Sequence, residues 1–396
     1  MKIAINGAGV AGPALAYWLH SNGHEPTLIE RSPCFRTGGY VIDFWGVGYT
    51  MAERMGILPG VLDAGYTVRE LRIVDEHGRK VGGFRTDIFQ KFTNGRFTSL
   101  PRGDLASVIY RTVEDRVETI FGNSISAIEE GGSCLHVEME HGPARDFDLV
   151  VGADGLHSRV RRLAFGPEER FEKQLGYCVA SFAAEGYRPR DELAYVAHAS
   201  PGRQLSRIAL RDDRTVFLFV FRAELVPGAE PSNLAETRAV LRSAFGDMCW
   251  ESKRILEAME DAEEIYFDRV SQIRMDRWSQ GRAILIGDAA CAVSLLAGEG
   301  TGLAMTEAYV LAHELERAKG DHRAAFENYD KRLRPFVEGK QRAAEGFARS
   351  FVPGTALGVW VRNQATKLLA MPWIGEWLVG RSVSVRDDFE LPEYAE

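Results

Sequence analysis

Cysteine is scarce in this chain of 396 residues, and the five that occur follow no recognisable pattern. Their number is odd, and their spacing matches neither a disulfide framework nor a metal site. The sequence therefore predicts free thiols, no bound metal and a reduced, cytoplasmic setting. The five positions are Cys34, Cys134, Cys178, Cys249 and Cys291.

Long apolar runs and an excess of positive charge are also lacking. No segment reaches the length of a membrane span, and the first residues are typical of a strand rather than a signal peptide, so we expect no membrane association. Lys and Arg number 48 against 56 Asp and Glu, a net charge of −8, and the arginines are scattered. This balance argues against a nucleic-acid partner.

Glycine is abundant, and its first cluster lies in INGAGVAGPALAYWLHSNGHEPTLIER, residues 5–31. A short apolar run leads directly into apolar residues at helical spacing, which predicts a strand that turns into a helix. Gly7 permits the tight turn, Gly9 lets a pyrophosphate approach the backbone, and Gly12 allows close helix-to-strand packing.

The acidic residue that follows this turn narrows the choice of nucleotide. A second strand, PTLIE, ends at Glu30, 18 residues after Gly12. A carboxylate there accepts hydrogen bonds from ribose hydroxyls and would repel a 2′-phosphate. The sequence thus predicts FAD or NAD rather than NADP.

Two kinds of pattern interleave along the rest of the chain. Segments of βαβ type are separated by blocks of alternating apolar and polar residues, such as 71–84 and 214–225. Alternation is typical of an antiparallel sheet, and several such blocks fall within 171–270. Residues 303–351 then have helical spacing, and we expect a last amphipathic stretch, 356–380, to dock on the chain's own domains.

Two later segments each end a buried strand at an Asp beside Gly. In DFDLVVGADGLHSRVRRLAFG the strand leads to Asp154, which either points into the ligand crevice of an open α/β sheet or caps the next helix, as Ser158 could. In GRAILIGDAACAVSLLAGEGTGLAMTEAYVLAHEL the strand ends at Gly287 and Asp288. Its glycine-rich loop opens a helix at Leu303, a second N-terminus that favours an anion.

Together these segments resemble the FAD-dependent aromatic hydroxylases of the p-hydroxybenzoate hydroxylase fold, the group A flavin monooxygenases, over nearly the whole chain. The chain looks closest to the tetracycline-inactivating monooxygenases and the aromatic polyketide hydroxylases across GGYVIDFWG (38–46), LPRGDL (100–105) and the Asp288 region. The resemblance implies an α/β fold: a Rossmann-like FAD-binding domain, an inserted, mostly antiparallel β-sheet substrate domain and a C-terminal helix. The nucleotide is then FAD, with Glu30 on its adenosine ribose.

The implied division assigns 1–70, 101–170 and 271–350 to the FAD-binding domain, 71–100 and 171–270 to the substrate domain, and 351–396 to the C-terminal helix and tail. We expect the inserted sheet to set substrate choice. Phe217, Phe219 and Phe221 could present a face to a planar aromatic guest or fill an ordinary core.

The resemblance also implies a set of cofactor-binding residues: Gly7, Gly9, Gly12, Glu30, Arg31, Arg36, Asp43, Arg102, Asp154, Asp288, Gly300, Gly302 and Leu303. Asp288 would hydrogen-bond the ribityl chain, and Arg102 would reach the flavin side of the pyrophosphate or the ribityl. Arg36 and Asp43 would lie beside the isoalloxazine, although Arg36 could equally be a solvated surface charge. The helix N-terminus at Gly300 would meet the flavin pyrimidine edge, where its dipole stabilises the anion of reduced flavin.

Two positions depart from the family's pattern. After GDAA the family usually has His and, a few positions later, Pro, whereas this chain has Cys291 and Leu295. This leaves open how substrate is oriented and activated, and the catalytic residues stay unknown. We interpret Cys291 as plain packing and His157, beside the Asp154 motif, as incidental.

The activity implied by the resemblance is monooxygenation with NAD(P)H and O₂. Hydride passes from NAD(P)H to FAD, O₂ forms a flavin C4a-hydroperoxide, and oxygen goes to a phenolic or polycyclic aromatic or enolic small molecule. Because no second dinucleotide fingerprint occurs, NAD(P)H should bind only transiently. A reductase or dehydrogenase without oxygen transfer and a non-catalytic FAD-fold escort protein stay as alternatives. The substrate, the choice of NADH or NADPH, and monomer against homodimer remain open.

Overall fold

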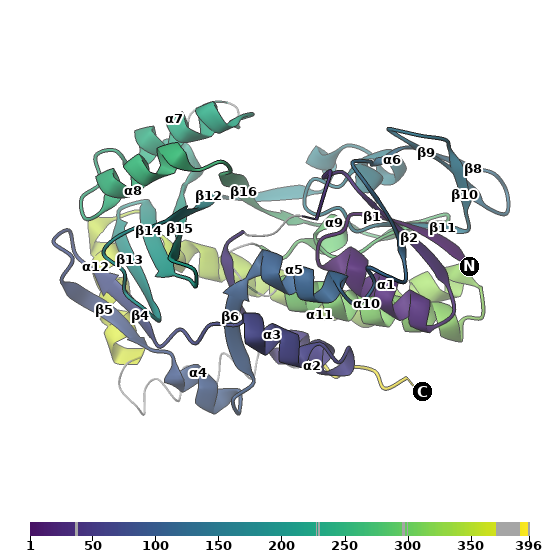
Figure 1. The fold of residues 1–396 in the computed structure, drawn as a ribbon, viewed down its shortest axis with the longest axis horizontal. Coiled ribbons are helices and arrows are strands. Elements are labelled where there is room, and N and C mark those ends of the chain that lie inside the picture. The colour runs from purple at the N-terminus through teal and green to yellow at the C-terminus, as the bar shows by residue number, and fades with distance from the viewer. Residues whose placement is uncertain are drawn as a thin grey trace.

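Two sheets organise the chain in the computed structural model, which describes residues 1–35, 39–226, 228, 230–294, 298, 300–369 and 389–394. A largely parallel, six-stranded sheet lies in one half of the molecule and a mostly antiparallel, seven-stranded sheet in the other (Figure 1). The predicted α/β fold class, a Rossmann-like sheet combined with an antiparallel one, is confirmed.

The six-stranded sheet is built from segments far apart in the sequence. Its order is β17 (Ser279–Gln280), β18 (Ala283–Leu285), β11 (Leu149–Gly152), β1 (Lys2–Asn6), β2 (Glu25–Glu30) and β7 (Glu118–Phe121). All neighbours pair in parallel except β17 with β18. The central β11 is apolar and buried throughout, as a parallel strand covered on both faces must be.

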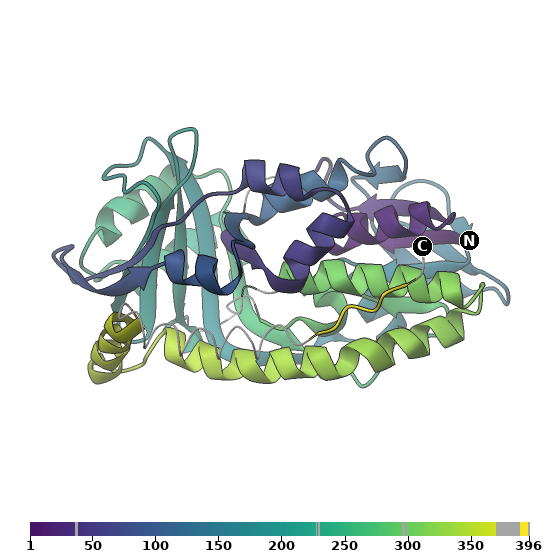
Figure 2. The same cartoon turned by 90° about the horizontal axis from the view of Figure 1, so that it is seen from below.

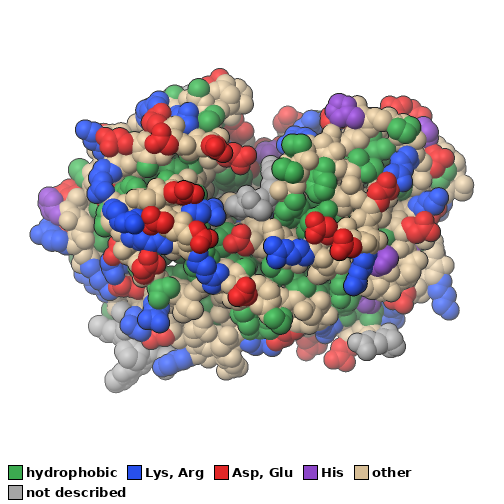
Figure 3. Space-filling model, in the orientation of Figure 1, with side chains coloured by type: hydrophobic (Ala, Val, Ile, Leu, Met, Phe, Trp, Pro, Cys, Tyr) green, Lys and Arg blue, Asp and Glu red, His purple; other side chains and the backbone are tan. Residues whose placement is uncertain are grey.

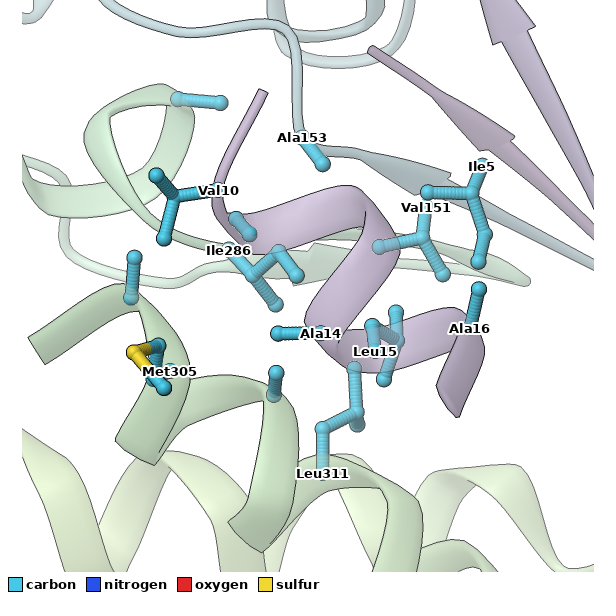
Figure 4. Packing of buried hydrophobic residues seen from close by; sticks show 14 of the residues in the cluster. Ile5, Val10, Ala14, Leu15, Ala16, Val151, Ala153, Ile286, Met305 and Leu311 are labelled. Carbon is cyan, nitrogen blue, oxygen red and sulfur yellow. The ribbon is translucent and has the colours of Figure 1, made fainter. Parts of the chain in front are cut away.

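Helix α1 (Ala11–Ser21) covers this sheet and is in turn covered by α10 (Gly300–Arg317). Figure 4 shows Ala14 and Leu15 of α1 between sheet residues such as Val151 and the α10 residues Met305 and Leu311. All five side chains are fully buried. The glycine turn after β1 and the late glycine-rich helix therefore share one core, which fixes their relative positions.

The seven-stranded sheet has one face covered by helices of the inserted segment. Its order is β16 (Tyr266–Ile273), β12 (Glu172–Glu185), β15 (Arg214–Arg222), β14 (Arg203–Ala209), β13 (Ala194–Ser200), β4 (Glu70–Val74) and β5 (Lys80–Arg85), antiparallel except for β13 with β4. Phe217, Phe219 and Phe221 share a buried cluster with residues of α7 (Leu234–Phe245) and α8 (Ser252–Ala258). These three rings therefore fill an ordinary core, and the idea that they face a ligand is wrong.

The other face of this sheet, the inner face, looks toward the half that holds the six-stranded sheet. Register places Ser206, Leu218, Ser181 and Tyr266 in one row across β14, β15, β12 and β16. The long α11 (His322–Phe351) spans both halves along one side of the molecule, and α12 (Ala356–Leu369) packs beside β5 and β13 (Figure 2). The described part of the C-terminal amphipathic stretch thus docks on the chain itself, as expected.

Smaller elements complete the fold between and around the two sheets. Two of them pair as β3 (Val41–Trp45) with β6 (Phe97–Pro101), and a third sheet holds β8 (Ile125–Glu130), β9 (Leu135–Met139) and β10 (Arg145–Phe147). The remaining helices are α2 (Gly46–Arg54), α3 (Leu58–Ala64), α4 (Asp87–Phe92), α5 (Arg102–Tyr110), α6 (Arg159–Phe165), α9 (Asp288–Cys291), and the short 3₁₀ helices η1 (Glu168–Arg170), η2 (Ala223–Leu225) and η3 (Met259–Asp261).

Candidate flavin and substrate site

The glycine turn after β1 has the tight geometry that its sequence predicts. Gly7 has a φ of +109°, and a Cβ there would lie 2.5 Å from the carbonyl oxygen of Ala153. A Cβ on Gly12 would lie 2.0 Å from the Gly7 carbonyl oxygen, whereas one on Gly9 would meet nothing within 4 Å. The turn thus needs two of its glycines for packing, and the third leaves open space where a diphosphate could approach the backbone.

Glu30 ends β2 beside this turn and is 9% exposed. Its carboxylate accepts hydrogen bonds of 2.8 Å from the backbone N–H groups of Ala8 and Ser32. It is therefore held by the loop that would carry the nucleotide. Arg31, the next residue, is exposed. Whether either residue meets the ribose stays a prediction.

Asp288 begins α9 and is half-buried at the carboxyl end of β18. Burial raises the pKa of its carboxyl, and the nearby Arg102 guanidinium offsets part of that rise. A Cβ on Gly300, at the start of α10, would lie 3.6 Å from Asp288 Oδ1. No hydrogen bond between described residues uses the Asp288 carboxylate, so the acceptor predicted for a ribityl hydroxyl has no protein donor among them.

Arg102 begins α5, and its backbone N–H donates to the carbonyl of Tyr40 over 3.0 Å. The Tyr40 hydroxyl also interacts with the Arg102 side chain, and burial raises its pKa. The Tyr40 ring lies 5.9 Å from that of Tyr266 on the inner face of the second sheet. Sequence reasoning missed Tyr266, because nothing in its spacing marks it, whereas Tyr40 lies in the GGYVIDFWG segment that carries the family resemblance.

The Asp154 carboxylate accepts hydrogen bonds from groups of the protein itself. It accepts from the Asn6 amide at 2.8 Å, from Ser158 Oγ at 2.5 Å, and from the backbone N–H groups of Arg159 and Val160 at 2.8 and 3.1 Å. Ser158 in turn caps α6 by accepting from the Arg161 N–H. The capping interpretation describes these contacts, and a direct role of Asp154 toward FAD stays a prediction.

Asp43 and the N-terminus of α10 come together in one small hollow. Its lining includes Asp43, Thr301, Gly302 and Leu303, together with Phe336 of α11. Ser99 Oγ donates to Asp43 over 2.7 Å, while surrounding protein raises the pKa of the Asp43 carboxyl. Gly302 also lets α10 cross α2 closely, since its Cβ would lie 3.0 Å from the Cα of Gly48. Arg36 and Leu295 lie outside the described residues.

Cys291 is more than packing. Its thiol donates to Glu307 Oε1 over 3.1 Å, and the other oxygen of Glu307 accepts from the Gly287 N–H and, over 3.3 Å, from the Tyr329 hydroxyl. Burial raises the pKa of Glu307 to about 7. This buried cluster holds the turn that presents Asp288, and only the apolar run around Glu307 could have hinted at it.

The geometry of the site fits a dinucleotide cofactor: a glycine turn with open space, an acid at the end of the next strand, and, beside a helix N-terminus, an acceptor with no donor among the described residues. These features define a dinucleotide-binding α/β protein. The chain belongs to the FAD binding domain family, whose model matches residues 52–343.

Relatives extend this likeness over the whole chain. A flavin-dependent monooxygenase from an unknown prokaryotic organism is 33% identical and covers 99% of both chains, and one from Legionella longbeachae is 31% identical over 100% of this chain and 98% of its own. The crystal structure of tetracycline destructase Tet(51) superposes with a TM-score of 0.84 at 31% identity, over 99% of each chain. Klebsiella pneumoniae HpxO, solved with FAD and uric acid, shares the fold (TM-score 0.75, 20% identity, 96% and 97% coverage).

The protein is thus a flavin-dependent monooxygenase that binds FAD. FAD supplies the redox chemistry and the activation of oxygen when it is bound. All five cysteines are free, as expected. Among the described residues, no cluster of three or more metal-binding side chains occurs, and no helix has both the length and the apolarity needed to span a membrane.

Proposed function

We propose that this monooxygenase uses NAD(P)H and O₂ to hydroxylate a planar phenolic, or polycyclic and enolic, small molecule. The observation that carries the proposal is the likeness to a tetracycline destructase at 31% identity over 99% of each chain. That relative is a tetracycline destructase, so its target is polycyclic, and this chain shares its fold over 99% of each chain.

The inner face of the seven-stranded sheet supports the substrate class. Leu218, Tyr195 and Tyr266 are half-buried there, whereas the phenylalanines on the opposite face are fully buried. Tyr195 and Val41 of β3 pack against the same buried cluster of the sheet, and the Tyr195 hydroxyl lies 2.6 Å from Ser206 Oγ. An apolar face with a few fixed hydroxyl groups suits a flat guest that carries oxygen substituents.

The two halves also leave room between them. On the face shown in Figure 3 the surface is hollowed where the halves meet, and acidic and basic side chains are mixed on both sides. Asp43, on β3 between the sheets, stays accessible to solvent. In the proposed reaction Asp43 and Tyr195 would orient the guest by hydrogen bonds, and the apolar walls would exclude water.

Phenols, anthraquinones and tetracyclines should be screened for stimulated NAD(P)H oxidation by the FAD-loaded protein, with oxygen uptake and product mass recorded together. We expect at least one planar hydroxylated compound to stimulate oxidation and to gain one oxygen atom. Stimulation without mass gain would identify the reductase alternative. No stimulation by any of the three classes would contradict the proposed substrate class.

A further inference from the structure

His157 lies at the junction of the two halves, between two carboxylates. Its Nε2 is 3.2 Å from Asp268 Oδ1 on β16, and its Nδ1 is 2.8 Å from Glu168 Oε1 on η1. The imidazole side chain is 51% exposed, whereas Asp268 is 11% exposed. One side chain from the loop before α6 therefore bridges the FAD-binding half to the inner face of the second sheet.

The further contacts of each carboxylate lead toward the candidate flavin site. Glu168 Oε2 pairs at 2.5 Å with the fully buried Arg161, whose Nη1 donates to the Ala289 carbonyl over 2.9 Å, one residue after Asp288. Asp268 accepts from the Tyr266 hydroxyl over 3.1 Å, and the Tyr266 ring faces Tyr40 beside Arg102. The bridge thus ends next to both predicted flavin-binding residues, at the Ala289 carbonyl after Asp288 and at the Tyr40 ring beside Arg102.

The charges of Asp268 and His157 also affect the candidate flavin site. Asp268 acts on Asp288 strongly enough to raise the pKa of the Asp288 carboxyl further. The groups that face the imidazole are Asp268 and Glu168, with Arg161 behind Glu168 and Tyr266 behind Asp268. Hydrogen bonds that the ring donates to Asp268 and to Glu168 raise the pKa of His157 to about 10, so the ring is a cation at neutral pH. Without it, Asp268 would add negative charge to the site.

We propose that His157 is a positioning residue of the flavin site: as a cation clamped between Asp268 and Glu168, it ties β16 to α6 and neutralises the charge that Asp268 would otherwise place near the flavin. This inference rests on FAD lying at Asp288 and Arg102, and it is independent of the proposed substrate. The same imidazole also keeps Tyr266 against Tyr40 by holding Asp268 in place.

An ordinary surface ion pair is the alternative, and the chain offers a matched example. His136 on β9 lies 2.8 Å from Asp146 on β10, with a side chain 47% exposed. That pair joins two adjacent strands and has one carboxylate. Exposed pairs of this kind contribute little. H136Q is therefore the control for H157Q.

The decisive measurement is the midpoint potential of bound FAD, titrated on the FAD-loaded full-length protein at about pH 8. Unneutralised Asp268 disfavours the anion of reduced flavin, so H157Q should have a lower potential than wild type. H136Q should match wild type. The double variant H157Q/D268N should recover the potential, because it removes the same charge that H157Q exposes. A packing defect alone would not be rescued this way.

Two further measurements test the inference: the flavin potential of D268N, which does not depend on how well H157Q folds, and the FAD affinity of H157Q. D268N alone leaves His157 a cation facing one carboxylate, so its flavin potential should rise above that of wild type. The FAD dissociation constant of H157Q should increase by roughly tenfold, as for loss of one partner of a partly buried charged pair. The inference is overturned if H157Q and H136Q share the wild-type potential, if H157Q/D268N stays at the H157Q value, or if D268N changes nothing. Substrate screening plays no part in any of these outcomes.

Discussion

At the scale of single residues, the Asp288 carboxylate is an acceptor with no protein donor among the described residues, beside a helix N-terminus. If it accepts from the ribityl chain as predicted, D288A loses a charged hydrogen bond worth on the order of 1.5 to 3 kcal/mol. The FAD dissociation constant should then increase by roughly tenfold to a hundredfold. Fluorescence titration of the flavin-free protein measures this directly. D276A, which removes an exposed carboxylate in the same part of the chain, is the control, and equal affinities would mean that the flavin lies elsewhere.

Glu30 tests the adenosine end of the same cofactor. Glu30 and Glu25 end and begin the same strand, but Glu30 is buried against the glycine turn and Glu25 is exposed. E30K should therefore weaken FAD retention far more than E25K, since only Glu30 is predicted to meet the ribose and only Glu30 accepts from the Ala8 N–H. Retention after gel filtration, measured by absorbance, compares the two. Equal retention would exclude Glu30 as the ribose acid.

Residue-level prediction succeeded where spacing itself creates the geometry. The glycine turn and Glu30 follow from a strand, a helix and a strand in register, so local sequence is enough. His157 was expected to be incidental, and that expectation is wrong as to its contacts: its partners lie 11 and 111 positions away. Contacts of this range depend on how the two halves dock, which no local pattern contains.

At the scale of elements, the two faces of β15 lie in different surroundings: the inner face looks toward the half that holds the six-stranded sheet, and the other face is packed under two helices. Leu218 is half-buried on the inner face, and its neighbour Phe219 is fully buried under α7 and α8. L218A should change the Michaelis constant or the product pattern for a compound found in the screen, and it should leave FAD content unchanged. F219A should instead lower the free energy of unfolding by about 3 to 5 kcal/mol, the usual cost of deleting a buried ring. Wild-type kinetics in L218A would mean that the inner face is only a scaffold.

Alternation predicted the strands of this sheet but could not say which face would meet the ligand. Phe217, Phe219 and Phe221 looked suited to an aromatic guest by composition, and they form the core instead because α7 and α8 follow them in the chain and need a surface to cover. The inner face, where we propose that the guest binds, carries smaller and more mixed side chains such as Ser181, Leu218 and Ser206. Composition alone favours the wrong face in such a case.

At the scale of the whole molecule, docking of the two halves depends on elements that cross between them. Helix α11 passes from the core beneath α10 to the inner face of the second sheet, where Val352, the residue after it, is fully buried. The helical spacing of α11 was evident from the sequence. Its position across the two halves was not, because the two sheets that it joins are each built from segments distant in the chain. The domain boundaries given above stay predictions for the same reason.

Glu307, at the centre of the molecule on α10, makes stability depend on pH in a defined direction. Burial raises the pKa of its carboxyl from the ordinary 4.5 to about 7, so the folded protein holds a proton that the unfolded chain releases. This contribution to the free energy of unfolding is full below about pH 4.5 and is lost as the pH rises to about 7, by roughly 3 kcal/mol over the interval.

Gln at position 307 cannot ionise. Relative to wild type, E307Q should therefore gain stability as the pH rises from 5 to 7.5, measured by urea unfolding at a fixed saturating FAD concentration. E327Q, which changes an exposed acid on the neighbouring helix α11, is the matched control. If E307Q keeps a constant difference from wild type over this interval, Glu307 is already ionised at pH 5, and the thiol, backbone and tyrosine donors around it outweigh its burial.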